Sequence, residues 1–169
     1  MQKSGFFTAR QLEDGTGYDR EYSAADFAAF FAMLFKNGIR ENTHLRVRST
    51  GDGNHIQIDT GQAIINGYHY ILTEPLILHL QTPPMPQRRV WCVVLRLDLR
   101  RDEGRKISVE LVAGEDSIMT PTAPNITRND EIFELGLADI LLNSTTLTVT
   151  EGSITDLRLD SEFCGVITM

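Results

Sequence analysis

The sequence has little cysteine, few aromatic residues and no long apolar run. Its 169 residues include two cysteines, Cys92 and Cys164, which is too few for a disulfide framework or a cysteine-based zinc site. No apolar stretch approaches the roughly 20 residues that a membrane-spanning helix needs, and the first residues lack the apolar segment of a secretory signal. We therefore expect no membrane insertion and a protein that is made and folded in a reducing cytoplasm.

Positive charge is scarce as well. The chain has 16 Lys and Arg residues against 23 Asp and Glu residues, a formal net charge of −7. Proteins that bind nucleic acid without strict specificity need basic surface to neutralise phosphates, and anionic membranes attract basic segments. The charge balance therefore argues against a nucleic-acid partner and against docking on a membrane surface.

The sequence also lacks the motifs of common catalytic and cofactor sites. It contains no G-x-S-x-G, no phosphate-binding loop and no glycine-rich dinucleotide turn. The four histidines, His44, His55, His69 and His79, never stand two or four residues apart. A metal site would require folding to bring them together. We therefore interpret the chain as not an enzyme, with no catalytic residues, no cofactor and no metal.

One segment carries strong helix signals and stands ahead of a β-rich chain. Ser23 and Asp26 have the spacing of a capping box, in which each side chain hydrogen-bonds to the backbone amide of the other residue. Gly38 supplies the left-handed residue that often ends a helix. These signals predict a helix over residues 22–38, preceded by an N-terminal extension of residues 1–21.

The predicted helix is rich in phenylalanine. One apolar stripe at helical spacing consists of Phe27, Phe30, Phe31 and Leu34. Such a stripe is most often part of the core of its own domain, so we expect Phe27 and Phe31 to be needed for folding. Met33 and Phe35 widen the apolar surface and are expected to contact another subunit. The predicted interface residues are Phe27, Phe31, Met33 and Phe35.

After residue 43 the apolar period changes from helical to alternating. Residues 45–49 and 55–59 flank a Gly-Asp-Gly-Asn turn, and Asn66-Gly67 is the preferred pair for a type I′ hairpin. Residues 146–150 are another strand candidate. One helix followed by eight to ten short strands predicts a mainly β fold. We expect a single domain, residues 1–169, in which an antiparallel β-sandwich spans residues 44–167 and the N-terminal helix packs against it.

Several charged residues stand two apart in strand-like segments. Alternation places Arg96 and Asp98 on one face, and it places Asp156, Arg158 and Asp160 on another. We interpret these residues as structural ion pairs rather than as a carboxylate pair for hydrolysis. A bridge from Arg158 to Asp98 across the sheet is a further hypothesis.

Two features leave other interpretations open. Residues 114–130 form a long irregular connection, and loops of this length are usually functional or packed on a neighbour. Tyr68 and Tyr70 share one strand face and, if exposed, would form an aromatic surface of the kind that binds sugars. A carbohydrate-binding module that contacts host glycans is therefore the alternative function. A hydrolase of cell-wall glycans has the least support.

Five segments together resemble one family in their order and spacing. They are DREYSAADFAAFFAMLFKNGI, GQAIINGYHY, RVWCVVLRLDLRRDEGRKISVELVAGE, PNITRNDEIFELGLADILL and ITDLRLDSEFCGVI. The set spans roughly residues 17–167 and is similar to the N-terminal domain of baseplate or tail-tip structural proteins of siphophages and prophages. The nearest types are the upper baseplate protein and receptor-binding proteins. Proteins of this type often continue into linker or receptor-binding regions, whereas this chain ends at Met169.

The resemblance implies a structural, non-enzymatic role. Such a domain docks a fibre or receptor-binding component onto the phage tail through contacts with other tail proteins, and it forms homo-oligomers such as trimers or hexamers. The implied location is the virion, after synthesis in the cytoplasm of the bacterial host. The matching positions are interpreted as fold-defining: Tyr22, Asp26, Phe27, Phe30, Gly61, Asn66, Gly67, Tyr70, Arg96, Asp98, Asp156, Arg158, Asp160, Cys164 and Gly165.

Overall fold

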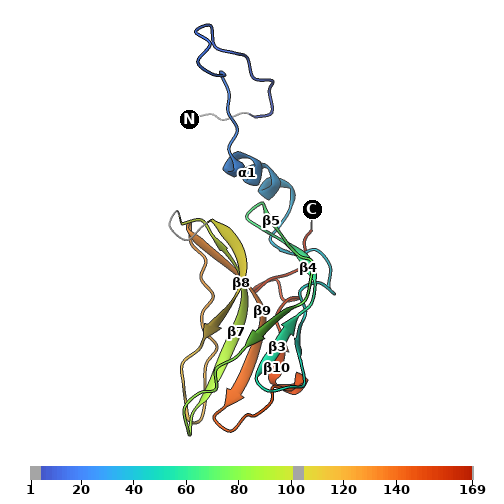
Figure 1. Ribbon diagram of the computed structural model, residues 1–169, viewed down its shortest axis with the longest axis vertical. Helices are drawn as coiled ribbons and strands as arrows, with labels where there is room; N and C mark the ends of the chain where they lie inside the picture. Colours follow the sequence, from blue (N-terminus) through green and yellow to red (C-terminus); the bar gives the residue numbers. More distant parts are fainter. Residues whose placement is uncertain (1–4, 101–104, 169) are drawn as a thin grey trace.

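One α-helix, α1 (Ala24–Leu34), precedes ten strands in the computed structural model, which describes residues 5–100 and 105–168 (Figure 1). The strands are β1 (Gly38–Ile39), β2 (Val47–Ser49), β3 (His55–Ile58), β4 (Gly61–Ile65), β5 (Tyr68–Leu72), β6 (Leu76–His79), β7 (Arg88–Asp98), β8 (Lys106–Ala113), β9 (Ile132–Asn143) and β10 (Ile154–Asp156). A short 3₁₀ turn, η1 (Glu151–Ser153), precedes β10. The predicted mainly β fold with one helix is confirmed.

The strands form a two-layered sandwich. One layer is a four-stranded sheet of order β10-β9-β7-β8, and the other layer contains two three-stranded sheets, β1-β4-β5 and β2-β3-β6. All pairings between these strands are antiparallel. Apolar side chains from both layers, such as Ile56 and Ile65 from one and Leu95 and Ile140 from the other, form one buried cluster. This cluster is the core that holds the layers together.

Strand β7 is buried on both faces from Trp91 to Leu95. Inner residues such as Trp91 and Leu95 belong to the main core. On the outer face, Val94 packs in a second cluster with Leu157 from the C-terminal segment and Ile126 from the 114–130 connection. The long connection therefore covers part of a sheet of its own chain.

The Asn66-Gly67 turn forms as its sequence predicts, whereas the strand predicted at residues 146–150 does not form. Asn66 and Gly67 have φ of 49° and 80°, the left-handed values that a type I′ turn requires. Residues 146–150, in contrast, form no strand. Val149 instead donates its N–H to the Gly53 carbonyl at 2.9 Å, so this segment crosses the β2–β3 turn and does not extend a sheet.

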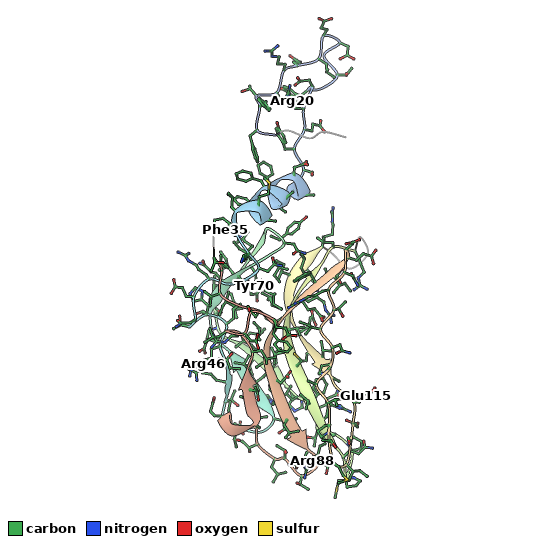
Figure 2. The ribbon with its side chains drawn as sticks, turned by 180° about the vertical axis from the view of Figure 1, so that it is seen from behind. Arg20, Phe35, Arg46, Tyr70, Arg88 and Glu115 are labelled. Carbon is green, nitrogen blue, oxygen red and sulfur yellow. The ribbon has the colours of Figure 1, made fainter. Side chains whose placement is uncertain are left out.

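Helix α1 meets the sandwich at one end instead of lying across a sheet face (Figures 1 and 2). The predicted capping box is present: Ser23 N–H donates to the Asp26 carboxylate at 2.9 Å, and Asp26 N–H donates to Ser23 Oγ at 3.3 Å. The helix rests on the tip of the β4–β5 hairpin. A Cβ atom added to Gly67 would lie 1.8 Å from the carbonyl oxygen of Ala28, so the two backbones are in direct contact.

The helix is shorter than the predicted 22–38 and ends at Leu34. The following residues are extended and hydrogen-bond to the C-terminal segment: Lys36 N–H donates to the Thr168 carbonyl at 3.2 Å, and Ile39 N–H donates to the Gly165 carbonyl at 3.0 Å. Gly38 lies in β1, where a Cβ would be 2.5 Å from the Gly165 oxygen. Gly38 is thus required for close contact between two segments and does not end the helix.

We expect Gly67→Ala to loosen α1 from the sandwich. Gly67 has a φ of +80°, and its new methyl group would meet the Ala28 carbonyl. Gly51→Ala is the matched control, because Gly51 has a φ of +74° and no described atom lies within 4 Å of its Cβ position. Each variant should lose about 1 kcal/mol from backbone strain.

Hydrogen exchange separates the two effects. Amides of α1 should exchange faster in Gly67→Ala than in the wild-type protein, and they should be unchanged in Gly51→Ala. Equal exchange of the α1 amides in both variants would show that the hairpin tip does not hold the helix.

Candidate functional site

An aromatic cluster joins α1 to the N-terminal extension. The Phe6 ring lies 4.7 Å from the Phe30 ring, 5.8 Å from the Phe27 ring and 5.9 Å from the Tyr22 ring, measured between centroids. The Tyr22 hydroxyl also accepts the Phe7 N–H at 2.9 Å. The extension therefore packs on the helix, and Figure 1 shows that it continues beyond α1, away from the sheets.

Most of the apolar surface of α1 is exposed. The exposed fractions are 44% for Phe27, 42% for Phe31, 77% for Met33 and 45% for Leu34. Ala28 is the one buried residue of the helix, and its one charged residue, Asp26, serves in the capping box. A helix that is apolar on all sides is normally buried. Helix α1 therefore has the composition of a buried helix, but the described part of the chain does not cover it.

The four predicted interface residues have different environments. Phe27 and Phe31 were expected in the core, and this expectation is wrong, because α1 sits on a hairpin tip and both rings remain more than 40% exposed. Met33 lies outside the phenylalanine stripe and is exposed to solvent. Phe35 is half-buried at the junction between α1 and the sandwich (Figure 2).

A groove separates α1 from the ends of β5, β7 and β8. Its volume is ≈ 940 Å³. Phe27 and Phe31 form the helix side of the groove, while Tyr68, Leu97 and Ile107 line the opposite side. Most of the lining is apolar, and Arg105 and Lys106 border the groove beside β8, so the groove suits a ligand with an apolar surface.

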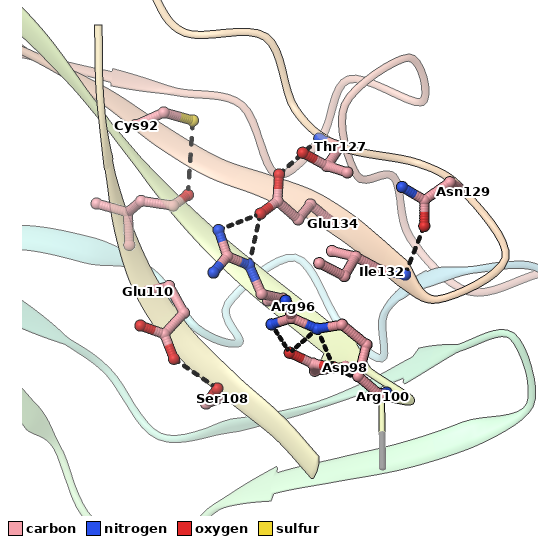
Figure 3. A network of polar contacts seen from close by, with 11 residues as sticks. Cys92, Arg96, Asp98, Arg100, Ser108, Glu110, Thr127, Asn129, Ile132 and Glu134 are labelled. Atoms are coloured by element: carbon pink, nitrogen blue, oxygen red, sulfur yellow. Dashed lines mark hydrogen bonds and ion pairs between the residues drawn. The ribbon is translucent and has the colours of Figure 1, made fainter. Parts of the chain in front are cut away.

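Arg96 and Asp98 each form an ion pair, but not with each other (Figure 3). Arg96 contacts the buried carboxylate of Glu134 at 2.6 Å, because the register of β7 and β9 places Glu134 directly opposite. Asp98 contacts Arg100 at 2.6 Å. Hydrogen bonds from that guanidinium lower the pKa of Asp98 to about 2. The shared strand face of Arg96 and Asp98 was therefore not enough to predict their ion-pair partners.

Arg158 is buried and does not bridge to Asp98. Its guanidinium pairs with Asp156 at 2.7 Å, as their shared face predicts. Nη1 donates to two backbone carbonyls, those of Asn42 at 2.9 Å and of His44. The side chain thus ties the C-terminal segment to the turn before β2.

Asp160 lies in the turn that follows Arg158 and has no ion pair within the described residues. Its carboxylate accepts the Glu162 N–H at 2.9 Å, and its carbonyl accepts the Cys164 N–H at 2.8 Å. The turn closes when Gly165 N–H donates to the Arg158 carbonyl at 3.0 Å. Asp160 therefore shapes the segment that supports the base of α1.

The aromatic residues of the sandwich pack inward. Tyr68 and Tyr70 are partly buried against the main core, and burial raises the pKa of Tyr70. Trp91 is buried and donates its indole N–H to the Gln81 carbonyl at 3.1 Å. These three rings form no exposed platform in the described sandwich, so they lend no support to the carbohydrate-binding alternative.

The outer face of β7 holds a thiol beside a carboxylate. Cys92 is opposite Asp139 in the β7–β9 register. Burial raises the pKa of the Cys92 thiol and also that of the Asp139 carboxyl. Because the thiolate is the reactive form of cysteine, a raised pKa makes Cys92 a poor nucleophile. Its environment is that of a small buried apolar residue.

Comparison of the chain with protein-family models, curated proteins and solved structures found no significant match. Within residues 5–100 and 105–168, no helix has the length and apolar character needed to cross a membrane. Support for a function therefore comes from the sequence resemblance and from the geometry of the helix end.

We expect Arg158→Ala to lower the free energy of unfolding by about 3 kcal/mol, because two backbone carbonyls and Asp156 lose their buried, charged donor. Asp156 is 44% exposed, so solvent screening limits what the ion pair itself contributes. Arg48→Ala is the control: Arg48 also pairs with a carboxylate, Asp59 at 2.6 Å, but at an exposed position. Urea denaturation should show a large loss only for Arg158→Ala. Similar small losses in both variants would contradict a structural role for the buried guanidinium.

Proposed function

We propose that the chain is a structural protein of a phage or prophage tail or baseplate. It would assemble with copies of itself and with other tail proteins, and it would dock a fibre or receptor-binding component by protein–protein contact. The five-segment resemblance supports this class of protein. The observation that carries the proposal is helix α1, in which ten of eleven residues are uncharged and Ala28 alone is buried.

The exposed helix gives a strong energetic reason for assembly. Fully burying a Phe, Leu or Met side chain is favourable by roughly 1.5–3 kcal/mol, so covering a half-exposed ring contributes about 1 kcal/mol. Phe27, Phe31 and Leu34 are each close to half exposed, and Met33 is more exposed. Each copy in an oligomer would gain this contribution, which favours association over a monomer in water.

The shape of the molecule favours assembly through one end. Helix α1 and the extension lie at the same end of the elongated sandwich (Figure 1). Small residues at Ala25, Ala29 and Ala32 allow helices to approach closely, and the phenylalanines border the groove beside β8. In a cyclic trimer or hexamer, helices from neighbouring copies would meet near the symmetry axis and leave the sandwich surfaces free for other tail proteins.

We expect the wild-type protein to be a trimer or hexamer by size exclusion with light scattering, and Met33→Asp to be a monomer. Met119→Asp is the matched control, since Met119 is a methionine with 82% exposure, and nearby Ser117 pairs with Arg88 at the end of the sandwich opposite α1 (Figure 2). The control variant should keep the wild-type mass. A wild-type protein that stays monomeric at high concentration, or a Met33→Asp variant with the wild-type mass, would contradict assembly through α1.

Phe31→Asp tests the corrected position of the phenylalanine stripe. The sequence alone predicts unfolding, whereas the structure places Phe31 outside the core. We therefore expect the variant to keep the far-ultraviolet circular dichroism and cooperative melting of the wild-type protein while it loses assembly. Loss of cooperative melting would show that the Phe31 side chain is needed for folding, which would contradict its position outside the core.

A further inference from the structure

Two histidines that are distant in sequence form a cross-strand pair. His55 on β3 is directly opposite His79 on β6. The neighbouring pair is bonded by Leu80 N–H to the Asn54 carbonyl at 2.8 Å, so the histidines occupy the adjacent, non-hydrogen-bonded position. Side chains approach most closely at such positions. The two imidazole centroids are 4.9 Å apart, with an interplanar angle of 55°.

The hydrogen bonding of His55 leaves one ring nitrogen available. Nδ1 lies 3.1 Å from the Asp52 carbonyl oxygen, which can only accept a hydrogen bond. The contact is a hydrogen bond only in the tautomer that carries the proton on Nδ1, and in that tautomer Nε2 keeps its lone pair. Histidines that bind metals commonly donate their other N–H to a backbone carbonyl in this way. His79 is exposed and makes no hydrogen bond to the described part of the chain.

The backbone around this pair is held by several contacts. Thr50 Oγ1 accepts the Asp52 N–H at 3.3 Å, and its one proton lies within reach of the carbonyls of Asp52 at 3.1 Å and His55 at 3.2 Å. Gly53 accepts the Val149 N–H at 2.9 Å. Asn54 Nδ2 donates to Thr82 Oγ1 at 2.7 Å, which connects the β2–β3 turn to the segment after β6. The two rings are thus presented by elements that are already fixed in place.

We propose that His55 and His79 together bind one divalent transition-metal ion of the class that prefers imidazole, namely Zn²⁺, Cu²⁺ or Ni²⁺. Two imidazoles that ligate one tetrahedral zinc ion with bonds of about 2.0 Å have ring centroids about 5 Å apart. The observed separation of 4.9 Å meets this requirement. No group of three or more His, Cys, Asp or Glu residues suited to a metal occurs within residues 5–100 and 105–168, so water would complete the coordination.

The bound ion would act as a clip between two strands. β6 is an edge strand of its sheet and pairs only with β3 among the named strands. A metal ligated by one residue from each strand binds the paired state and not the separated one, so it stabilises the edge in proportion to its concentration over its dissociation constant. This role is independent of assembly through α1.

The direct test is calorimetric titration of the untagged full-length protein with ZnCl₂ and NiCl₂, and with MgCl₂ as a hard-cation control. We expect one Zn²⁺ or Ni²⁺ site per chain and no Mg²⁺ binding. His55→Ala and His79→Ala should each weaken Zn²⁺ binding at least about tenfold. His69→Ala, which removes an exposed strand histidine without an imidazole partner, should bind Zn²⁺ like the wild-type protein.

A further readout separates a metal site from a simple ring contact. Zn²⁺ should raise the melting temperature of the wild-type protein and of His69→Ala, but not of His79→Gln, which keeps a polar side chain of similar size. Absence of Zn²⁺ binding by the wild-type protein, or full binding by His79→Ala or His79→Gln, would overturn the proposal.

Discussion

The buried guanidinium of Arg158 links segments that are more than a hundred residues apart, and the position of the helix depends on that link. Its contacts reach Asn42 and His44, which are 116 and 114 residues earlier in the chain. The same segment places Gly165, whose carbonyl accepts the Ile39 N–H. The direction in which the chain leaves α1 is therefore set by residues near the other end. Such long-range closure is entropically costly, and hydrogen bonds from a buried, charged donor offset part of that cost.

With its base fixed in this way, α1 is held away from the sheets and not drawn onto them. The Asn66-Gly67 turn supports the helix from below, and Phe6 packs on it from the extension. Neither contact covers Met33 or the outer halves of Phe27 and Phe31. The helix end combines a rigid support with an uncovered apolar surface. This combination supports the proposed assembly, because a helix that is already supported loses less conformational entropy on association.

Features set by local sequence could be predicted, and features set by register between distant strands could not. The capping box and the Asn66-Gly67 turn depend on residues within four positions of one another, and both are present as expected. The partner of Arg96 depends on the pairing of β7 with β9, which includes a register shift at Val93/Val94. The His55–His79 pair was missed because β3 pairs with β6 and the whole β4–β5 hairpin lies between them in sequence. The end of α1 was misplaced because hydrogen bonds to the C-terminal segment prevail over local helix signals.

The two layers of the sandwich differ in how well their strands are connected, and this difference relates the helix end to the histidine pair. The four-stranded layer is built on the long pairing of β7 with β9, whereas the other layer is divided into two three-stranded sheets. Division creates additional edges, and edges are the parts of a sheet that separate most easily or pair with other chains. Helix α1 rests on the turn that leads into edge strand β5, and the histidine pair joins edge strand β6 to β3. An oligomer built through α1 and a metal held by His55 and His79 would therefore each strengthen the divided layer. The oligomer contacts would act at the β4–β5 turn, and the metal would act at the β6 edge of the β2-β3-β6 sheet.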